Sequence, residues 1–154
     1  VKIDNINLRN NIFKWFENLS YVPQETNLIE GSLIENICPG IEKKDIDLTR
    51  INEVIEKAEL TSFVQKIGID KELNEFGQNL SGGEKQKIAL ARALYRNSNV
   101  ILLDEVTSAM DINSQNNFLK NFPKNFSEKT VIFITHKNDN LHIFDKILDL
   151  NNLN

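Results

Sequence analysis

Apolar residues follow two alternating patterns along the chain, short continuous runs and longer stretches with helical spacing. The short runs, rich in β-branched and aromatic residues, predict strands at Ser20–Pro23, Asn99–Asp104, Thr130–Thr135 and Lys146–Leu150. The second and third runs are continuously apolar, as expected of strands that are covered on both faces of a parallel sheet. Helical spacing predicts helices over Glu84–Arg96 and Ile112–Phe122. This alternation predicts an α/β fold with a mostly parallel sheet and flanking helices.

The segment Leu33–Ile67 departs from the alternation. It carries apolar residues at helical spacing and almost no strand signal. We therefore expect a small helical insertion between two strands of the sheet.

The stretch Asn79–Leu94 (NLSGGEKQKIALARAL) places a serine and two glycines directly before a predicted helix. The first N–H groups of a helix have no internal partner and favour anions, and glycines let a ligand approach the backbone. Ser81, Gly82 and Gly83 are therefore candidate phosphate contacts. Lys85 and Lys87 would add positive field or, as we expect, form solvated surface. The usual phosphate cradle, G-x-x-x-x-G-K-[ST], does not occur in this sequence.

Two carboxylates end the apolar run Val100–Glu105 (VILLDE). Open α/β folds bind ligands at the carboxyl edge of the sheet, where this run is expected to end. Because adjacent residues of a strand point to opposite faces, Asp104 and Glu105 are expected to differ in role. Asp104 would hold Mg²⁺, and Glu105 would orient or deprotonate a water molecule. The alternative is a strand that ends in polar residues because it reaches solvent.

Other polar residues follow predicted strands or precede a helix. His136, after TVIFIT, is a candidate hydrogen-bond donor to a phosphate oxygen, or an incidental surface residue. Gln24, at the end of YVPQ, is a candidate ligand of a metal, a water or a phosphate. Asp111, at the end of TSAMD, is expected to cap the following helix. His142 is expected to be structural or solvent-facing.

The order of these motifs resembles that of the nucleotide-binding domains of ATP-binding cassette (ABC) proteins. YVPQ resembles the family's Q-loop, LSGGE its signature motif, VILLDE its Walker B strand, SAMD its D-loop and ITH its H-loop. The resemblance implies a P-loop NTPase-like core, formed by residues 1–29 and 81–154, and a helical subdomain over about residues 30–80. In this family the Walker A loop lies upstream of the Q-loop. The chain is therefore expected to be a fragment that lacks the first strands and the P-loop, and to be inactive alone.

The resemblance also implies roles for the candidate residues. Family members bind ATP and Mg²⁺ between two nucleotide-binding domains that meet head to tail, so the Ser81–Gly83 turn would contact the γ-phosphate held by a partner domain. Asp104 and Gln24 would hold Mg²⁺, Glu105 the attacking water and His136 the γ-phosphate. Asp111 would add a contact across the interface.

Two segments favour the exporter type. Lys71–Asn79 (KELNEFGQN) resembles the T-x-V-G-E-x-G segment that contacts the transmembrane domain, and Glu30–Ile37 (EGSLIENI) resembles the stretch that follows the Q-loop. Glu30–Ile37 is also consistent with an ordinary helix start, in which Ser32 and Glu35 form a capping box. The resemblance thus implies a transmembrane domain as partner and a location at the cytoplasmic face of the plasma (inner) membrane.

Composition narrows the alternatives. The chain has 154 residues and a net charge of −4, and its 18 basic residues are scattered, which argues against a nucleic-acid partner. The single cysteine, Cys38, cannot form an internal disulfide and fits a reducing compartment. Two functions of other classes stay open: a soluble cassette ATPase in nucleic-acid or translation work, and a non-catalytic docking module that lost its P-loop.

Overall fold

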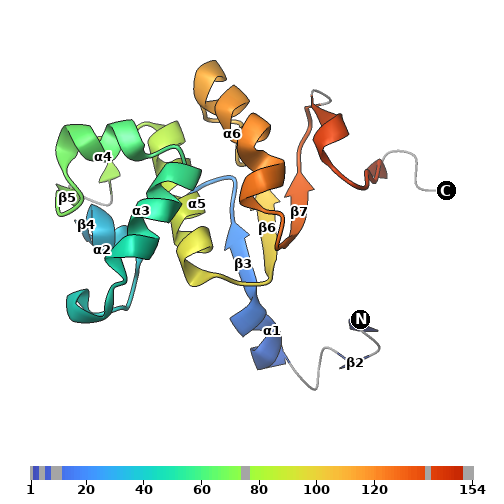
Figure 1. Cartoon of the computed structure of the whole chain (residues 1–154), viewed down its shortest axis with the longest axis horizontal. Coiled ribbons are helices and arrows are strands. Elements are labelled where there is room, and N and C mark those ends of the chain that lie inside the picture. The colour runs from blue at the N-terminus through green and yellow to red at the C-terminus, as the bar shows by residue number, and fades with distance from the viewer. Residues whose placement is uncertain (1, 4–5, 8–11, 74–76, 138–139, 151–154) are drawn as a thin grey trace.

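Three parallel strands form the central sheet in the computed structural model, which describes residues 2–3, 6–7, 12–73, 77–137 and 140–150. The order is β3-β6-β7, and the bounds are β3 Leu19–Val22, β6 Val100–Asp104 and β7 Thr130–Ile134 (Figure 1). In the register, Leu102 of β6 lies between Tyr21 of β3 and Ile132 of β7. Three of the four predicted strands and the parallel α/β architecture are confirmed.

The fourth predicted strand is wrong. Residues Lys146–Asp149 have no regular structure, and Ile147, Leu148 and Leu150 are exposed. A short apolar run becomes a strand only where a neighbouring strand completes its backbone hydrogen bonds. Within the described residues the sheet ends at β7, so this run has no strand to pair with.

One face of the sheet packs against helices. Helix α5 (Gly82–Arg96) lies along β3, and the aromatic ring of Phe122 in α6 (Ile112–Asn125) contacts Phe133 of β7. Val22, Ile101 and Leu103, which point to this face, are fully buried, whereas Val131 and Phe133 of β7 are partly buried. Both helices were predicted; α5 begins two residues before its predicted start, and α6 ends three residues after its predicted end.

The opposite face of the sheet is open in the part of the chain that the structure describes. Tyr21 and Ile132 are each 52% exposed and Ile134 is 41% exposed. The strands therefore alternate between buried and more accessible positions. This differs from the expectation of strands covered on both faces, because the described helices cover only one of them.

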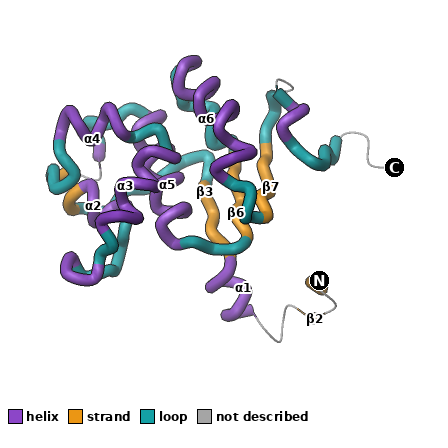
Figure 2. Tube along the Cα trace, viewed as in Figure 1, coloured by secondary structure: helices purple, strands orange, loops and turns teal. Residues whose placement is uncertain are grey.

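The insertion between β3 and α5 is mainly helical, as predicted. Its helices form the region on the left of Figure 2, beside α5, and its two short strands pair antiparallel. The elements are β4 (Gly31–Ser32), α2 (Leu33–Ile37), the 3-10 turn η2 (Lys43–Asp45), α3 (Leu48–Lys57), α4 (Thr61–Ile67) and β5 (Glu72–Leu73). Both α2 and α3 contact α5, which therefore joins the insertion to the sheet.

Local capping fixes where the helices begin. Ser32 and Glu35 form the predicted capping box at α2, so its structural interpretation is confirmed. The side chain of Asp111 caps α6, also as predicted, by accepting from the Ser114 backbone N–H at 3.0 Å. These side chains satisfy N–H groups that have no partner within their own helix.

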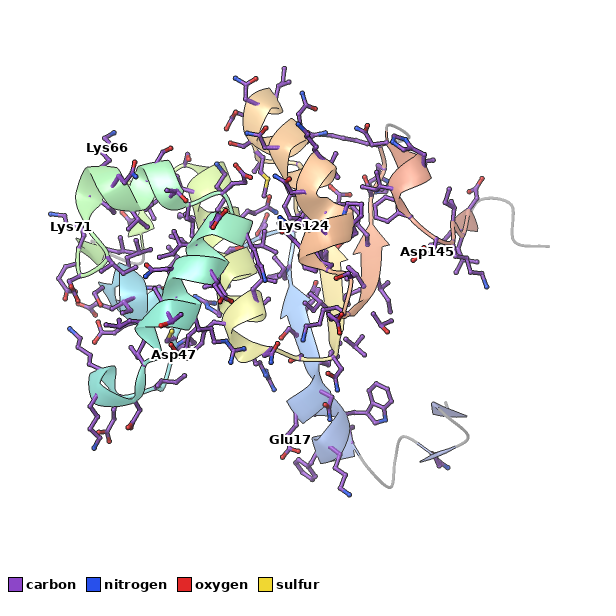
Figure 3. The ribbon with its side chains drawn as sticks, in the orientation of Figure 1. Glu17, Asp47, Lys66, Lys71, Lys124 and Asp145 are labelled. Atoms are coloured by element: carbon purple, nitrogen blue, oxygen red, sulfur yellow. The ribbon has the colours of Figure 1, made fainter. Side chains whose placement is uncertain are left out.

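The remaining described elements lie at the ends of the chain. They are β1 (Lys2–Ile3), β2 (Ile6–Asn7), α1 (Ile12–Asn18) and the 3-10 turn η4 (Leu141–Ile143). His142, in η4, is exposed, as predicted. Charged side chains of both signs project from different elements around the molecule (Figure 3). Among the described residues, no helix combines the length and the apolar character that crossing a bilayer requires.

Candidate functional site

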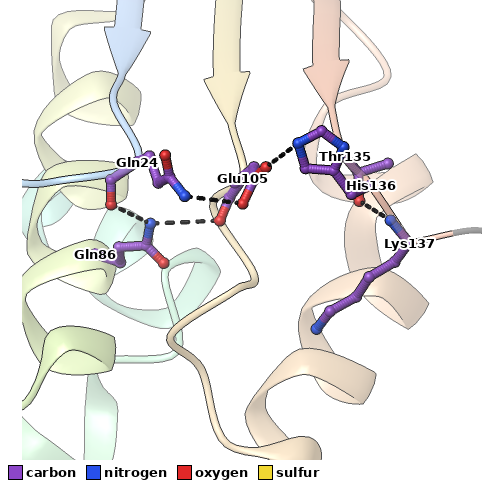
Figure 4. A network of polar contacts seen from close by, with 6 residues as sticks. All are labelled: Gln24, Gln86, Glu105, Thr135, His136 and Lys137. Atoms are coloured by element: carbon purple, nitrogen blue, oxygen red, sulfur yellow. Dashed lines mark hydrogen bonds and ion pairs between the residues drawn. The ribbon is translucent and has the colours of Figure 1, made fainter.

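Glu105 lies at the centre of a hydrogen-bonded network at the carboxyl edge of the sheet. The Nε2 atom of Gln24 donates to one carboxylate oxygen at 3.0 Å, and Nε2 of His136 lies 2.8 Å from the other (Figure 4). The side chain of Glu105 is 17% exposed and that of His136 is 88% exposed. Three predicted site residues from the ends of three neighbouring strands therefore meet, with a partly buried carboxylate between two donors.

The backbone of Glu105 is held in an unusual conformation. Its φ angle is 48°, in the left-handed region, which costs a non-glycine residue about 1–2 kcal/mol. Its backbone N–H donates to the carbonyl of Ile134 at 3.0 Å, beyond the last pair of β6 and β7. This turn directs the Glu105 side chain away from the path of the strand. Strained backbone held by its surroundings is common at functional sites.

Gln86 belongs to the network but is absent from the predicted site. Its Nε2 atom donates to the backbone carbonyls of Gln24 at 3.0 Å and of Glu105 at 3.4 Å (Figure 4). Gln86 is 1% exposed. The sequence carried one signal for it. Gln86 shares the buried face of α5 with Gly83 and Leu90, at spacings of three and four residues, where an apolar side chain is expected.

Asp104 makes a separate contact on the open face of the sheet. The hydroxyl of Tyr21 donates to its Oδ2 atom at 3.0 Å. This hydrogen bond, with smaller effects of burial and of the Asp104 charge, raises the pKa of Tyr21. Asp104 and Glu105 thus have different partners, in line with their predicted difference in orientation.

The Ser81 turn makes its hydrogen bonds with Glu84 and not with the network around Glu105. Its hydroxyl and backbone N–H donate to the carboxylate of Glu84 at 2.8 Å and 2.7 Å, and the Glu84 backbone N–H donates back to the hydroxyl. Ser81 and Gly82 are exposed, whereas Gly83 is buried. A Cβ atom on Gly83 would lie 2.6 Å from the carbonyl oxygen of Ala109, so this glycine permits close contact between α5 and the turn before α6.

Asp111 and Lys87 meet at Ser114. Asp111 accepts from the Ser114 hydroxyl at 2.6 Å, and the Nζ atom of Lys87 donates to the same hydroxyl at 2.7 Å. The Ser114 hydrogen bonds are the main cause that lowers the pKa of Asp111. The prediction that Lys87 is solvated surface holds only in part, because Lys87 is half-buried and helix α5 presents it to the start of α6.

The donor set fits Mg²⁺ only in part. Asp104 offers carboxylate oxygens, and Gln24 offers Oε1, since its amide nitrogen is bound to Glu105. In the part of the chain that the structure describes, no three His, Cys, Asp or Glu residues gather where they could hold a metal ion. Mg²⁺ commonly takes one or two protein ligands and completes its shell with phosphates and water. Asp104 and Gln24 each offer an oxygen ligand of the kind that Mg²⁺ prefers.

One exporter-related segment lies partly outside the described residues. Glu75, the acidic residue of KELNEFGQN, falls there. Gly77, of the same segment, has a φ of 69°, and a Cβ atom there would lie 2.6 Å from the Leu28 side chain. Gly77 therefore allows this segment to lie close to the stretch that follows Gln24.

Comparisons with known proteins point to ABC transporters. The model of the family described as "ABC transporter" matches residues 1–108. P-glycoprotein 14 of Caenorhabditis elegans is 36% identical over 151 residues, which cover 96% of this chain and 11% of that protein. ATP-dependent lipid A-core flippase 2 of Colwellia psychrerythraea is 34% identical over 134 residues, which cover 86% of this chain and 23% of that protein.

A solved structure agrees with the sequence comparisons. The structure of a bacterial Atm1-family ABC exporter with ATP bound matches with a TM-score of 0.75 and 30% identity, over 83% of this chain and 23% of that one. The chain spans between 10% and 25% of the length of the curated relatives that it matches. The motif order, the parallel sheet and these matches together show that the chain belongs to the ABC transporter family and corresponds to part of an exporter-type nucleotide-binding domain.

Proposed function

We propose that this chain forms part of the ATP-hydrolysing domain of an ABC exporter, which drives transport by head-to-tail dimerisation around ATP. The observation that carries the proposal is the carboxylate of Glu105, held between Gln24 and His136 at the carboxyl edge of the sheet. A general base needs this kind of setting: a partly buried carboxylate, oriented by neighbours, at a ligand-binding edge.

The residues at this edge of the sheet have different roles in ATP hydrolysis. Glu105 accepts the proton of the attacking water, and His136 gives up its bond to Glu105 in order to donate to the γ-phosphate. Asp104 and Gln24 would hold Mg²⁺, which would neutralise phosphate charge. Gln24 also links the site to the membrane part, since its backbone opens the loop that leads to the helical insertion.

The Ser81–Gly83 turn serves a second domain. It begins a helix of 15 residues, and its first two residues are exposed. The N-terminus of such a helix carries about half a positive charge, which favours an anion presented from outside. We propose that the turn contacts the γ-phosphate bound by a partner nucleotide-binding domain, with Asp111 beside the same interface.

The open face of the sheet is where the rest of the nucleotide-binding domain packs. Tyr21 and Ile132 are each 52% exposed there, on either side of Leu102, and the Tyr21 hydroxyl donates to Asp104. Exposed apolar rows on a parallel sheet call for a covering layer. A segment that carries the Walker A loop on this face would bring the phosphates to Asp104 and Glu105.

The partners and location follow from the family. We propose a transmembrane domain, a second nucleotide-binding domain and a site at the cytoplasmic face of the plasma (inner) membrane. The 154 residues alone are expected to bind Mg-ATP weakly, because their sequence contains no backbone nest with a Lys for the phosphates. Micromolar affinity of this chain for Mg-ATP in calorimetry would contradict that expectation.

ATP hydrolysis by the full-length protein tests the proposal. We expect Mg-ATP-dependent phosphate release that Glu105→Gln slows by about 10²–10⁴-fold, the usual contribution of a general base, while ATP stays bound. Glu53→Gln, on the exposed surface of α3, is the control and should hydrolyse ATP like the wild type. Unchanged turnover in Glu105→Gln would assign the base role to another residue, and no turnover in the wild type would remove the ATPase function.

A further inference from the structure

We infer that Gln86 is a positioning residue for hydrolysis, one that sets the place of both Glu105 and Gln24. This inference rests on the proposed ATPase function and adds a residue to it. Gln86 contacts the backbone of both residues and acts through the two loops that carry them.

Three residues form a closed ring of hydrogen bonds. The Gln86 side chain donates to the backbone of Gln24 and of Glu105, and the Gln24 side chain donates to the carboxylate of Glu105 (Figure 4). Glu105 is thus held at its carbonyl by Gln86 and at its carboxylate by Gln24. Removal of the Gln86 amide would open the ring at two of its three bonds.

The orientation of the Gln86 amide is fixed by these partners. Both neighbours of Nε2 are carbonyl oxygens, which only accept hydrogen bonds, so a flipped amide would place oxygen against oxygen. The Oε1 atom is buried and accepts no hydrogen bond from the described residues. A buried amide with one unsatisfied atom is unfavourable for stability, so packing alone gives no reason for a glutamine at this position.

Gln86 also connects the Ser81–Gly83 turn to the Glu105 network, because it lies on the helix that this turn begins. It lies one turn after Gly82 and Gly83, on the helix that begins with the phosphate-facing turn. Through Gln86, this rigid helix is bonded to the loop of the catalytic base and to the loop of Gln24. A shift in Glu105 of about 1 Å is enough to lower an enzymatic rate by about 10²-fold.

Steady-state hydrolysis by the full-length protein tests the inference. Gln86→Met has similar length and no donor. We expect it to lower kcat by about 10²-fold and to change KM for ATP by less than about threefold, because the bonds it removes orient groups rather than bind substrate. Ile88→Val is the control: it removes one methylene from a fully buried position of the same helix and should keep kcat within about twofold of the wild type.

A double-mutant cycle separates positioning from general destabilisation. In a Glu105→Gln background the part of the loss that comes from the base is already absent, so Gln86→Met should lower the residual single-turnover rate by clearly less than the loss of about 10²-fold expected in the wild type, and what is left comes from Gln24. If Gln86→Met does not fold, as judged by melting temperature, Gln86→Leu takes its place in both assays, since it also lacks a donor and places no charge beside the two carbonyl oxygens.

The outcomes are distinct. Wild-type kcat in Gln86→Met would overturn the inference, as would a full additional loss in the Glu105→Gln background. Failure of both variants to fold would also overturn it, because the role of Gln86 would then be structural. An inactive wild type would instead refute the proposed ATPase function itself.

Discussion

The Nε2 atom of His136 lies 2.8 Å from a carboxylate oxygen of Glu105, across the ends of β6 and β7. The second carboxylate oxygen of Glu105 accepts from Gln24 at the end of β3. Side chains that follow the two neighbouring strands, β3 and β7, thus fix the orientation of the carboxylate that follows β6. His136 is 88% exposed, which leaves it free to turn toward a bound phosphate.

Removal of this imidazole should slow hydrolysis in the full-length protein. His136→Ala deletes one of the two donors that orient Glu105, and we expect phosphate release to fall by about 10²-fold. His142→Ala is a matched control, because His142 is exposed in the 3-10 turn η4 and takes no part in the network. Equal rates in the two variants would argue against the role of His136.

The two signature glycines should respond differently to alanine. At Gly83 a Cβ atom would lie 2.6 Å from a backbone oxygen of Ala109, so Gly83→Ala should lower the free energy of unfolding by about 1–3 kcal/mol. At exposed Gly82 the nearest atom is the Ala109 Cβ at 3.3 Å, and the change in stability should stay within about 0.5 kcal/mol.

ATP hydrolysis gives a second test of Gly82. Gly82→Ala should still reduce ATP hydrolysis, because its methyl group stands where a phosphate approaches the helix N-terminus. Thermal unfolding and phosphate release, measured on the same preparations, check both statements. Full activity in Gly82→Ala would mean that no phosphate approaches this turn.

Charge at the Ser81 turn should oppose the phosphate. The Glu84 carboxylate occupies both donors of Ser81, and as an anion it repels a second anion. Glu84→Gln keeps the geometry of a capping box but removes the charge. We expect KM for ATP to fall and the melting temperature to drop slightly, since the helix loses an acidic residue in its first turn. An unchanged or higher KM would contradict this account of the turn.

Burial should protect Cys38 from modification. Burial raises the pKa of the Cys38 thiol to about 11, above its ordinary value of 9.0. At pH 8 this leaves about a hundredfold fewer reactive thiolates than in the unfolded chain. Iodoacetamide should therefore label the Cys38 peptide slowly in native protein and quickly in denaturant, as measured by mass spectrometry.

The raised pKa of Cys38 also predicts that the folded state loses stability as the pH becomes alkaline. Between pH 9 and about 11 the folded state keeps a proton that the unfolded state has lost. The contribution of Cys38 to stability is therefore complete below pH 9 and is lost as the pH rises to about 11. Rapid native labelling at pH 8 would show that Cys38 is not buried.

The sequence predicted those parts of the fold that local pattern determines. The runs at β6 and β7 predicted strands that pair in parallel, and Asp111 and Ser32 cap helices through contacts within three residues. The run Lys146–Leu150 has the same local character but no neighbouring strand among the described residues, so the strand prediction failed. Pairing depends on residues far away in the sequence.

The sequence predicted which residues follow the strands at the candidate site, but it did not predict the hydrogen bonds between helix α5 and the neighbouring loops. Gln24, Glu105 and His136 each follow a strand, which is visible in the sequence. Gln86 was missed because a polar residue in an amphipathic helix is ordinarily assigned to the solvent face. Lys87 was assigned to solvent for the same reason, although it bonds to Ser114 across 27 positions.

The central claim is that the Ser81–Gly83 turn of one copy completes the ATP site of the other copy. It is tested most directly by placing two substitutions either on different copies or on the same copy. Two differently tagged copies of the full-length protein are co-expressed and purified as mixed pairs. In one pair, Glu105→Gln is on one copy and Gly82→Asp on the other. In the second pair, both substitutions are on one copy and the other is wild type. If the Ser81–Gly83 turn completes its partner's site, the first pair keeps one intact site and hydrolyses ATP faster than the second. Equal rates, or faster hydrolysis by the second pair, would contradict the account.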